Sequence, residues 1–450
     1  MTYARYDKLQ SEYRLIRDCL EGEQAVKDAG RLYTPKPDGM TTANYTAYVQ
    51  RGCFYDAPAM TLRALVGLAL RKDPVIKLPA RLEPMRLNAT NENAPMTVLI
   101  EDAVREGMSM GRFGLLLDFP PAGNSANTVP HISTFDAEAI EDYQTAYVDG
   151  RKVLTRVWLV SDETYEEAEV SYELILEDTI YKFRRFIRDQ HQTRVDVGEE
   201  IIPTVNGKAL DHIPFLMVSH EGLRPEEVRP PFSGLCRVAI SHFRNSCDRE
   251  HAIFLTSAPT PWISGSLPAD KVTTTIGAGA LWTLPEGCQV GMLEFTGAGV
   301  AAQKDLMEEK IETMVSLGAR MLSATMNRNE TLGTATQRTR AELSLLHGTV
   351  VSVEAGINHL LRLAAEWMGE NPEEAAITLS RDFIEITIDP KMVEAQMKLW
   401  MGGMISRATL YENLQAGEIA RADRPWQDEL AMIESEGGDL SAPVHRMGFP

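Results

Sequence analysis

The chain has 450 residues, with 64 acidic and 45 basic side chains and a formal net charge of −19. This acidic balance excludes a protein that clamps nucleic acid through a general excess of cations. Hydrophobic residues make up 44% of the sequence and charged residues 24%, which is typical of a globular protein with a sizeable core. At roughly 150 residues per domain, the length suggests about three structural units.

The first half of the chain alternates between helical and β-type patterns. Helical spacing of apolar residues predicts helices over 8–29, over 44–70 with an interruption near Pro58, and over 95–110. Short apolar runs between polar turns predict strands over 75–78, 111–118, 131–135, 153–160, 172–176, 180–187 and 213–218. The proline-rich segment 224–232 is the clearest boundary in the chain.

The second half has a different organisation. In chain order, the predicted elements are a helix over 234–255, a strand over 260–265, a glycine-rich β segment over 273–295, a helix over 302–322, a polar loop over 323–337, a long helix over 338–368, a strand over 383–388 and an acidic helical end with a turn at Gly402 and Gly403. The long helix keeps one apolar stripe, and at 1.5 Å per residue it would measure roughly 45 Å.

Cysteine use and hydropathy both favour a soluble protein made in a cytoplasm. An odd number of widely separated cysteines fits a reducing compartment; they are Cys19, Cys53, Cys236, Cys247 and Cys288. The first residues lack the apolar run of a signal peptide. The most apolar stretch, 62–70, is far shorter than the roughly 20 residues that cross a membrane. We therefore predict no membrane segment.

One glycine motif could indicate a nucleotide cofactor. Residues 297–302 read G-x-G-x-x-A, follow an apolar strand and precede a helix, as in sites where a pyrophosphate lies on a helix N-terminus. A second strand ending in an acidic residue should follow after about 20 residues, but the sequence there stays helical. A flexible glycine turn is the favoured interpretation. A cytoplasmic enzyme with a nucleotide cofactor at Gly297 and Gly299 stays open as the alternative.

Other catalytic patterns are missing from the sequence. It contains no phosphate-binding loop with its lysine, no paired histidine or cysteine motif for zinc, and no nucleophile elbow. The carboxylates of Glu308, Glu309 and Glu312 are expected on the solvated face of a helix, with Leu306 on the opposite, packed face. We predict no catalytic residue, no cofactor and no metal site.

The order of elements in the second half resembles that of the portal proteins of tailed bacteriophages, the head-to-tail connectors through which DNA enters and leaves the capsid. The resemblance extends over nearly the whole chain, and the order of its stretches carries more weight than any one of them. These stretches are 17–22, 25–27, 45–55, 65–67, 71–74, 248–251, 258–261, 284–287 and 405–409.

The resemblance implies an α+β subunit in a ring, usually of about twelve copies, with wing, stem, clip and crown regions. The implied regions are an N-terminal wing (1–232), a stem helix (233–257), the clip (258–301), a second stem helix (302–322), the tunnel loop (323–337), a long helix with a wing strand (338–395) and the crown (396–450). The implied location is the portal vertex of the virion, after assembly in the host cytoplasm.

The resemblance also implies the partners. They are further copies of the chain, double-stranded DNA passing without sequence preference, the terminase large subunit, a head-completion or adaptor protein, and the major capsid and scaffolding proteins. The acidic charge agrees with a DNA conduit, because each phosphate neutralised by a fixed base would hold the duplex in place. A capsid-associated scaffold without a channel is a further alternative.

Two sets of residues are expected to make the contacts. The tunnel loop combines small hydrogen-bonding side chains with one base and one acid, which suits a sliding contact with DNA; an ordinary surface loop is the alternative. Its candidate residues are Met326, Asn327, Arg328, Asn329, Glu330 and Thr331. In the clip, Trp262 and Trp282 are expected to contact partners, because tryptophan is enriched at binding hot spots. Core packing is the alternative for both.

Overall fold

The structure is a computed structural model, and the residues that it describes are 3–119, 129–148, 150–165, 168–188, 194–257, 260–266, 282–293, 298–319, 332–381, 383, 390–416, 420–421 and 424–435. The chain divides into two compact units, Met1–Arg381 and Asp382–Pro450. The first unit mixes helices with antiparallel sheets, which confirms the predicted α+β class. No helix of the described residues has the combined length and apolar character that crossing a membrane requires.

Helices dominate the N-terminal part of the first unit: α1 (Tyr3–Glu21), α2 (Glu23–Asp28), α3 (Thr42–Arg51), α4 (Ala57–Ala69) and α5 (Met96–Ser109). The single helix predicted over 8–29 is wrong, because Gly22 has a φ of +107° and separates α1 from α2. Glycine adopts such a φ without the steric penalty of a Cβ atom. Pro58 lies in the first turn of α4, where its missing N–H costs nothing.

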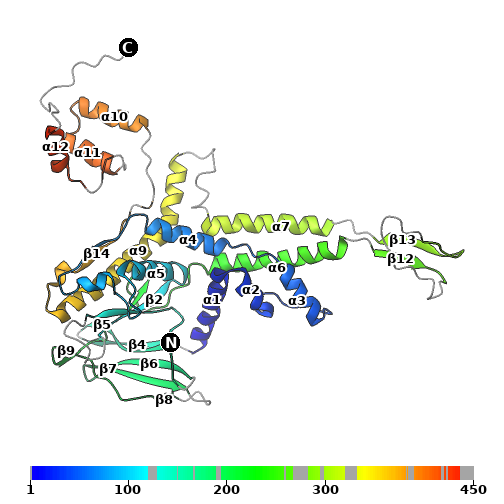
Figure 1. Ribbon diagram of the computed structural model, residues 1–450, viewed down its shortest axis with the longest axis horizontal. Coiled ribbons are helices and arrows are strands. Elements are labelled where there is room, and N and C mark those ends of the chain that lie inside the picture. Colours follow the sequence, from blue (N-terminus) through cyan, green and yellow to red (C-terminus); the bar gives the residue numbers. More distant parts are fainter. Residues whose placement is uncertain are drawn as a thin grey trace, which may run out of the picture. The chain divides into compact units, whose positions relative to one another are not determined.

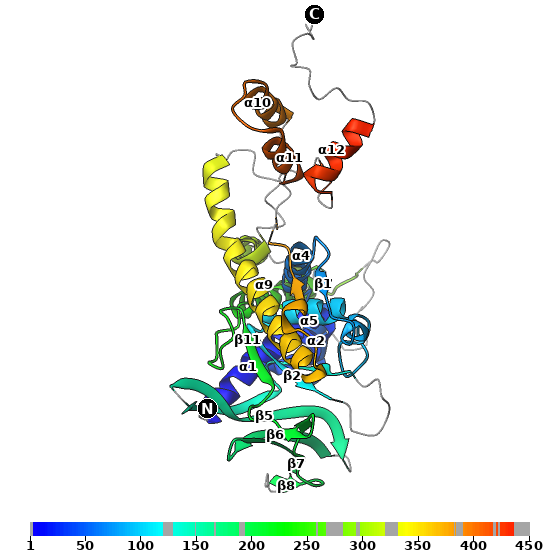
Figure 2. The same cartoon turned by 90° about the vertical axis from the view of Figure 1, so that its left-hand side faces the viewer.

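A sheet with the strand order β11-β2-β3 lies at the centre of the first unit. Its strands are β2 (Arg112–Asp118), β3 (His131–Phe135) and β11 (Phe215–Ser219). Helix α9 (Leu332–Met368) packs on β11 and α5 (Figure 2). The apolar stripe predicted for this helix is confirmed from Leu346 to Ala364, where Val350, Val353 and Ile357 are fully buried. The core of the unit therefore lies between α9, α5 and this sheet.

A short strand pair anchors the end of the first unit to α9. Strand β1 (Val75–Lys77) pairs antiparallel with β14 (Ala376–Thr378). The Asn358 side chain, on α9, donates to the carbonyl oxygen of Ile377 at 2.9 Å and accepts from its N–H at 2.6 Å. Strand β14 was not predicted from the sequence. Most of the strand predicted over 383–388 lies outside the described residues.

A second sheet of the first unit is antiparallel, with its strands in chain order: β4 (Ile140–Val148), β5 (Arg151–Tyr165), β6 (Ala168–Glu177), β7 (Ile180–Arg188) and β8 (Arg194–Asp196). The minor strands β9 (Thr204–Val205) and β10 (Lys208–Ala209) pair with each other. Arg184 of β7 forms an ion pair with Glu173 of β6 at 3.4 Å and another with Glu200, which follows β8, at 2.5 Å.

Two helices and a strand pair form the projecting part of the first unit. They are α6 (Ser233–Thr256), β12 (Thr260–Ser264), β13 (Gln289–Leu293) and α7 (Ala298–Met314), which continues as a π-helical turn over Val315–Ala319. Figure 1 shows α6 and α7 side by side. The second of these helices begins at Ala298, four residues earlier than predicted.

The second unit is helical where it is described, with α10 (Pro390–Met401), α11 (Arg407–Ala416) and α12 (Trp426–Ser435). The predicted turn is confirmed: Gly403 has a φ of +71° between α10 and α11. The Arg407 guanidinium lies 5.5 Å from the centre of the Trp400 ring. Because α10 already begins at Pro390, the predicted boundary at 396 falls inside a helix.

Candidate functional site

The pair of helices α6 and α7 carries the candidate interface. One side of α6 is part of the core, where Phe243 and Cys247 are fully buried against the N-terminal helices. The other side contacts α7, whose Lys310 donates from Nζ to the carbonyl oxygen of Ser241 at 3.1 Å and to Oδ1 of Asn245 at 3.0 Å. Helix α6 is therefore fixed on two sides.

Helix α7 is more exposed than its sequence pattern predicted. The carboxylates of Glu308, Glu309 and Glu312 are exposed, as expected. Leu306, which was expected on the packed face, is also exposed, at 43%. The prediction for Leu306 is wrong because α7 packs mainly on α6 among the described elements outside its own π-helical continuation, and Leu306 lies away from that contact. An exposed apolar residue of this kind is available to a partner.

The strand pair β12–β13 places Trp262 on its surface. Trp262 lies directly opposite Gly291 in the antiparallel pairing. A Cβ atom at Gly291 would lie 2.7 Å from the indole ring, so the ring covers the glycine backbone at a distance that a side chain would prevent. Trp262 remains 42% exposed. The expectation that Trp262 contacts a partner stays a prediction, and its exposure is compatible with that role.

The opposite face of this strand pair is apolar. Pro261 pairs with Met292 and Ile263 with Val290, and residues directly opposite each other share a face. Met292 is 51% exposed. Among residues 260–266 and 282–293, no further strand extends the pair. A pair of strands is marginally stable alone in water, so apolar surface on both of its faces favours an interface with another molecule.

The other predicted contact residues lie elsewhere. Trp282 is half-buried, lies outside β12 and β13, and has an interaction partner of its own. The tunnel-loop residues from Met326 to Thr331 lie outside the described residues. The end of the predicted loop is wrong, because α9 already begins at Leu332 and includes residues 332–337.

The glycine motif does not have the surroundings of a dinucleotide site. Gly299 lies in the first turn of α7, which begins at Ala298, and Gly297 lies outside the described residues. The strand before it, β13, pairs antiparallel with β12. A dinucleotide site needs parallel strands joined through a helix. The predicted glycine turn is wrong at Gly299, which is helical. The described residues around it lack the parallel strands that a dinucleotide site needs.

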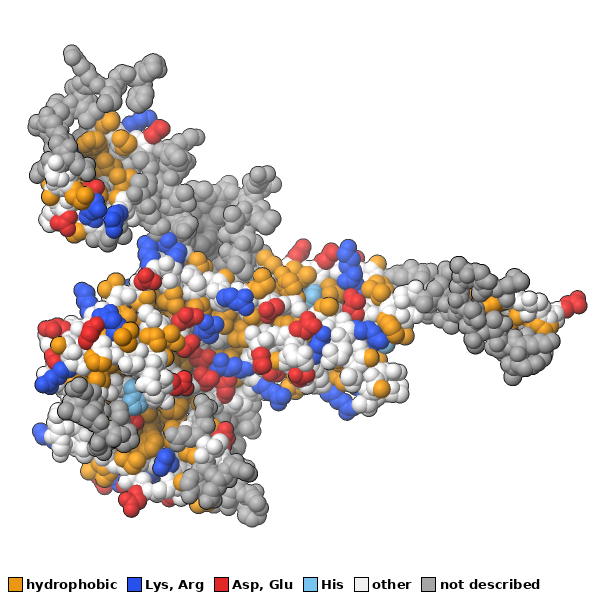
Figure 3. Space-filling view, in the orientation of Figure 1, with side chains coloured by type: hydrophobic (Ala, Val, Ile, Leu, Met, Phe, Trp, Pro, Cys, Tyr) orange, Lys and Arg blue, Asp and Glu red, His pale blue; other side chains and the backbone are white. Residues whose placement is uncertain are grey.

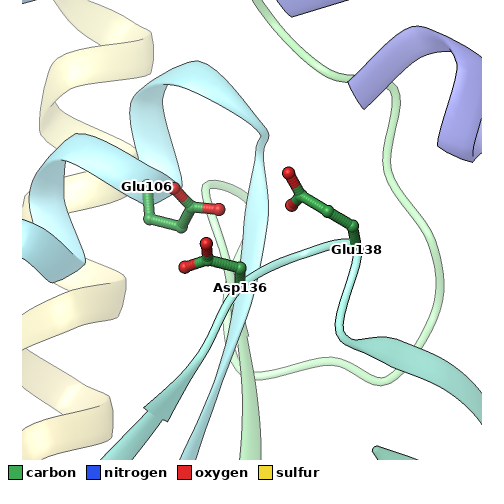
Figure 4. Close-up of side chains that lie close together, drawn as sticks. All are labelled: Glu106, Asp136 and Glu138. Atoms are coloured by element: carbon green, nitrogen blue, oxygen red, sulfur yellow. The ribbon is translucent and has the colours of Figure 1, made fainter. Parts of the chain in front are cut away.

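One group of carboxylates has the spacing of a metal site. Single oxygens of Glu106, Asp136 and Glu138 lie within 4.8 Å of one another, and the three side chains converge (Figure 4). The Arg17 guanidinium contacts all three, at 2.5 Å, 3.2 Å and 2.6 Å respectively. The positively charged Arg17 guanidinium therefore binds all three carboxylates, as a metal ion at this position would. This group was not predicted from the sequence, because Arg17, Glu106 and the pair Asp136 and Glu138 lie far apart in the chain.

Charge on the surface is mixed. Figure 3 shows acidic and basic side chains interspersed over the visible face of the described residues, including the part formed by α6 and α7. Several acids and bases there neutralise each other locally, such as Lys304 with Glu308 at 3.5 Å. Such a surface attracts nucleic acid only weakly, because strong binding requires uncompensated bases along the phosphates.

Comparisons with known proteins give three findings. A family model described as a domain of unknown function (DUF4055) matches residues 231–368, the part that contains α6, α7 and α9. The fold is similar to a chain in the virion of a native gene transfer agent particle, with 12% identity, a TM-score of 0.43, and coverage of 86% of this chain and 98% of that one. It is also similar to a chain in the neck of a native gene transfer agent particle computed with C12 symmetry, with 13% identity, a TM-score of 0.41 and the same coverage. No curated protein matches the chain.

Proposed function

We propose that the chain is the portal subunit of a tailed phage or phage-like particle. Its ring would form the channel through which double-stranded DNA is packaged and ejected. The observation that carries the proposal is the order of α6, β12, β13, α7 and α9: two adjacent helices enclose a small strand pair and precede a long buried helix. In a portal subunit, these elements correspond to stem, clip, stem and the long helix behind the tunnel loop.

The strand pair supports the assignment of a clip. Its apolar faces, with Trp262 on one side and Met292 on the other, are exposed in a single chain. In the assembled particle, we propose that this surface binds the terminase motor first and an adaptor protein later. The energy for packaging would come from the motor.

The charge of the chain supports a conduit for DNA. With a net charge of −19 per subunit, a ring would carry a large net negative charge that repels the phosphates. Duplex DNA presents one charge per about 1.7 Å, and each contact with a fixed base adds affinity that would slow passage. The acidic balance that excludes a clamp for nucleic acid is therefore suited to a channel.

Electron microscopy of the purified protein tests the proposal. We expect rings with a central channel wide enough for a DNA duplex, and class averages with cyclic symmetry. A chain that stays monomeric over a range of salt and protein concentration would contradict the proposal. Closed assemblies without a central channel would instead favour a scaffold.

Replacing Trp262 by alanine should leave the ring intact and weaken binding of the terminase large subunit by roughly 10- to 100-fold, the loss expected for an exposed tryptophan at a hot spot. Biolayer interferometry with immobilised rings measures this affinity. Tyr147, an aromatic residue of β4 that is 77% exposed, provides the control: Tyr147→Ala should bind as the wild type does. If rings of Trp262→Ala bind the terminase large subunit as tightly as the wild type and Tyr147→Ala do, Trp262 is not part of the motor interface.

A further inference from the structure

The carboxylate group around Arg17 joins three separate elements of the first unit. Arg17 is on α1, Glu106 is on α5, and Asp136 and Glu138 lie between β3 and β4. Besides its contacts with Arg17, Glu106 accepts a hydrogen bond from the N–H of Ala137 at 3.3 Å. Through Arg17, the group thus fastens the N-terminal helix to the segment that follows β3, an edge strand of the central sheet.

The charges in this group do not balance. Three ionised carboxylates and one guanidinium would leave a charge of −2, with the three acids within 4.8 Å of one another. Glu106 is only 8% exposed, so water screens its charge poorly. Like charges this close disfavour full ionisation, and one carboxyl group in such a cluster keeps its proton to higher pH.

We infer that this cluster holds a proton near neutral pH, and that the bound proton stabilises the attachment of α1 to the segment between β3 and β4. Glu106 is the group that carries it most favourably, because Arg17 can still donate to both oxygens of Glu138, at 2.6 Å and 3.0 Å, when Glu106 is neutral. Asp136 is 63% exposed and can ionise toward water. This inference is independent of the proposed function.

The surroundings of Glu106 favour the neutral form. Burial raises the pKa of Glu106 to about 7; Arg17 opposes this effect, and Asp136 and Glu138 add to it. On the same helix, Arg105 is paired with Glu101 at 2.5 Å. On β2, Arg112 donates to the carbonyl oxygen of Ile140 at 3.3 Å.

The cluster reaches solvent through Asp136, whose side chain is 63% exposed. Arg17 also lines an open cavity of about 320 Å³ between α1, α4 and α5. The other charged residues on this cavity are Arg63, Arg105 and Glu21. Two of these are bases, so they favour the ionised carboxylate at longer range and oppose the proton. The carboxylates themselves lie much closer to one another, and their repulsion outweighs the more distant, solvated bases.

The bound proton affects more than the local contact, because α1 also contacts α6. Glu12 pairs with Arg237 at 2.5 Å, and the Cys19 thiol lies against the carbonyl oxygen of Cys236. Helix α1 therefore connects α6 with the central sheet. Loss of the proton would introduce repulsion where α1 meets the segment between β3 and β4, while the contacts between α1 and α6 would remain.

The sign of the pH effect follows from linkage. The folded state holds the proton up to about pH 7, whereas an unfolded glutamate loses it near its ordinary pKa. Between these values the folded state binds more protons than the unfolded state, so stability falls as the pH rises. If Glu106 were instead ionised in an ordinary buried ion pair, the free energy of unfolding would depend on pH in the opposite direction. Stability would then fall as the pH is lowered below the ordinary pKa of glutamate.

Glu106→Gln tests the inference, because glutamine mimics the protonated acid. We expect the variant and the wild type to melt at similar temperatures at about pH 4, below the ordinary pKa of glutamate, and the variant to melt higher at pH 8.5. Hydrogen exchange of α1 and of residues 136–140, corrected for the intrinsic rate at each pH, should slow by about tenfold in the variant at pH 8.5. Glu101→Gln, which removes an exposed charge from the same helix, should follow the wild type.

Two results would overturn the inference. One is a variant whose melting temperature parallels that of the wild type at every pH. The other is a variant that loses more stability at pH 8.5 than at pH 4, which would show that Glu106 is ionised. Asp136→Asn provides a second measurement if the glutamine variant does not fold. It also removes one repelling charge and should flatten the pH dependence, and an unchanged slope would again contradict a shared proton.

Discussion

Deletion of residues 326–331 should leave the ring intact and reduce the yield of DNA-filled particles to near background. The deleted segment contains all six candidate contact residues of the tunnel loop and ends directly before α9, which begins at Leu332. Further along, α9 is held in the core by Leu346 and Val350, which are almost fully and fully buried respectively. The deletion should therefore remove a contact with moving DNA while the fold and the assembly remain.

The measurement needs two parts. Negative-stain images of the variant test for rings, and nuclease-protected DNA in purified particles measures packaging. A variant with glycine and serine at the same six positions retains the length of the segment and removes Arg328 and Glu330; we expect an intermediate yield, because a single base per subunit contributes only part of the contact. Normal packaging by the deletion variant would refute the tunnel-loop assignment, and loss of rings would assign the segment to assembly instead.

Helical periodicity predicted the elements whose apolar faces are buried. Helix α5 was predicted within one residue at each end, and α9 was recognised from its stripe of Val350, Val353 and Ile357. After Leu332, its first residues, 333–337, are polar or small and form no apolar face, so the pattern gave no reason to start the helix there. The break at Gly22 was missed because it depends on a local φ and not on hydropathy.

Strands were predicted less completely than helices, and the reason is burial. Strand β4 was missed because most of its residues are exposed or half-buried, so alternation gives no apolar signal; Ile140 is its fully buried residue. Strand β14 has three residues, too few for a pattern. The position of β14 is set by pairing with β1 and by Asn358 of α9, which are contacts that only the folded chain brings together.

The candidate site could be predicted in its residue types but not in its geometry. Trp262 was selected from the sequence, whereas its position over Gly291 requires the register of β12 and β13. The Arg17 cluster could not be predicted at all. Arg17 and Glu106 are 89 residues apart in the sequence, and neither lies in a motif that would connect them.

Replacing Phe243 by alanine should destabilise the first unit by about 3–5 kcal/mol, the usual cost of removing a buried phenylalanine. The Phe243 ring is fully buried on α6 and lies edge-to-face with Phe54, with 6.2 Å between ring centres. The packing around it is tight: a Cβ atom at Gly52 would lie 3.0 Å from the Phe243 ring. The cavity left by alanine therefore has few neighbours that can move to fill it.

Phe254 provides the matched control on the same helix. It is 55% exposed, and the Arg51 guanidinium lies 3.7 Å from the centre of its ring. Phe254→Ala should cost no more than about 1 kcal/mol, the value of an exposed cation–π contact. Thermal unfolding and hydrogen exchange of α6 distinguish the two variants. Equal effects would mean that α6 is not fixed through Phe243, and the proposed stem would then lack the rigid attachment to the N-terminal helices that a channel wall requires.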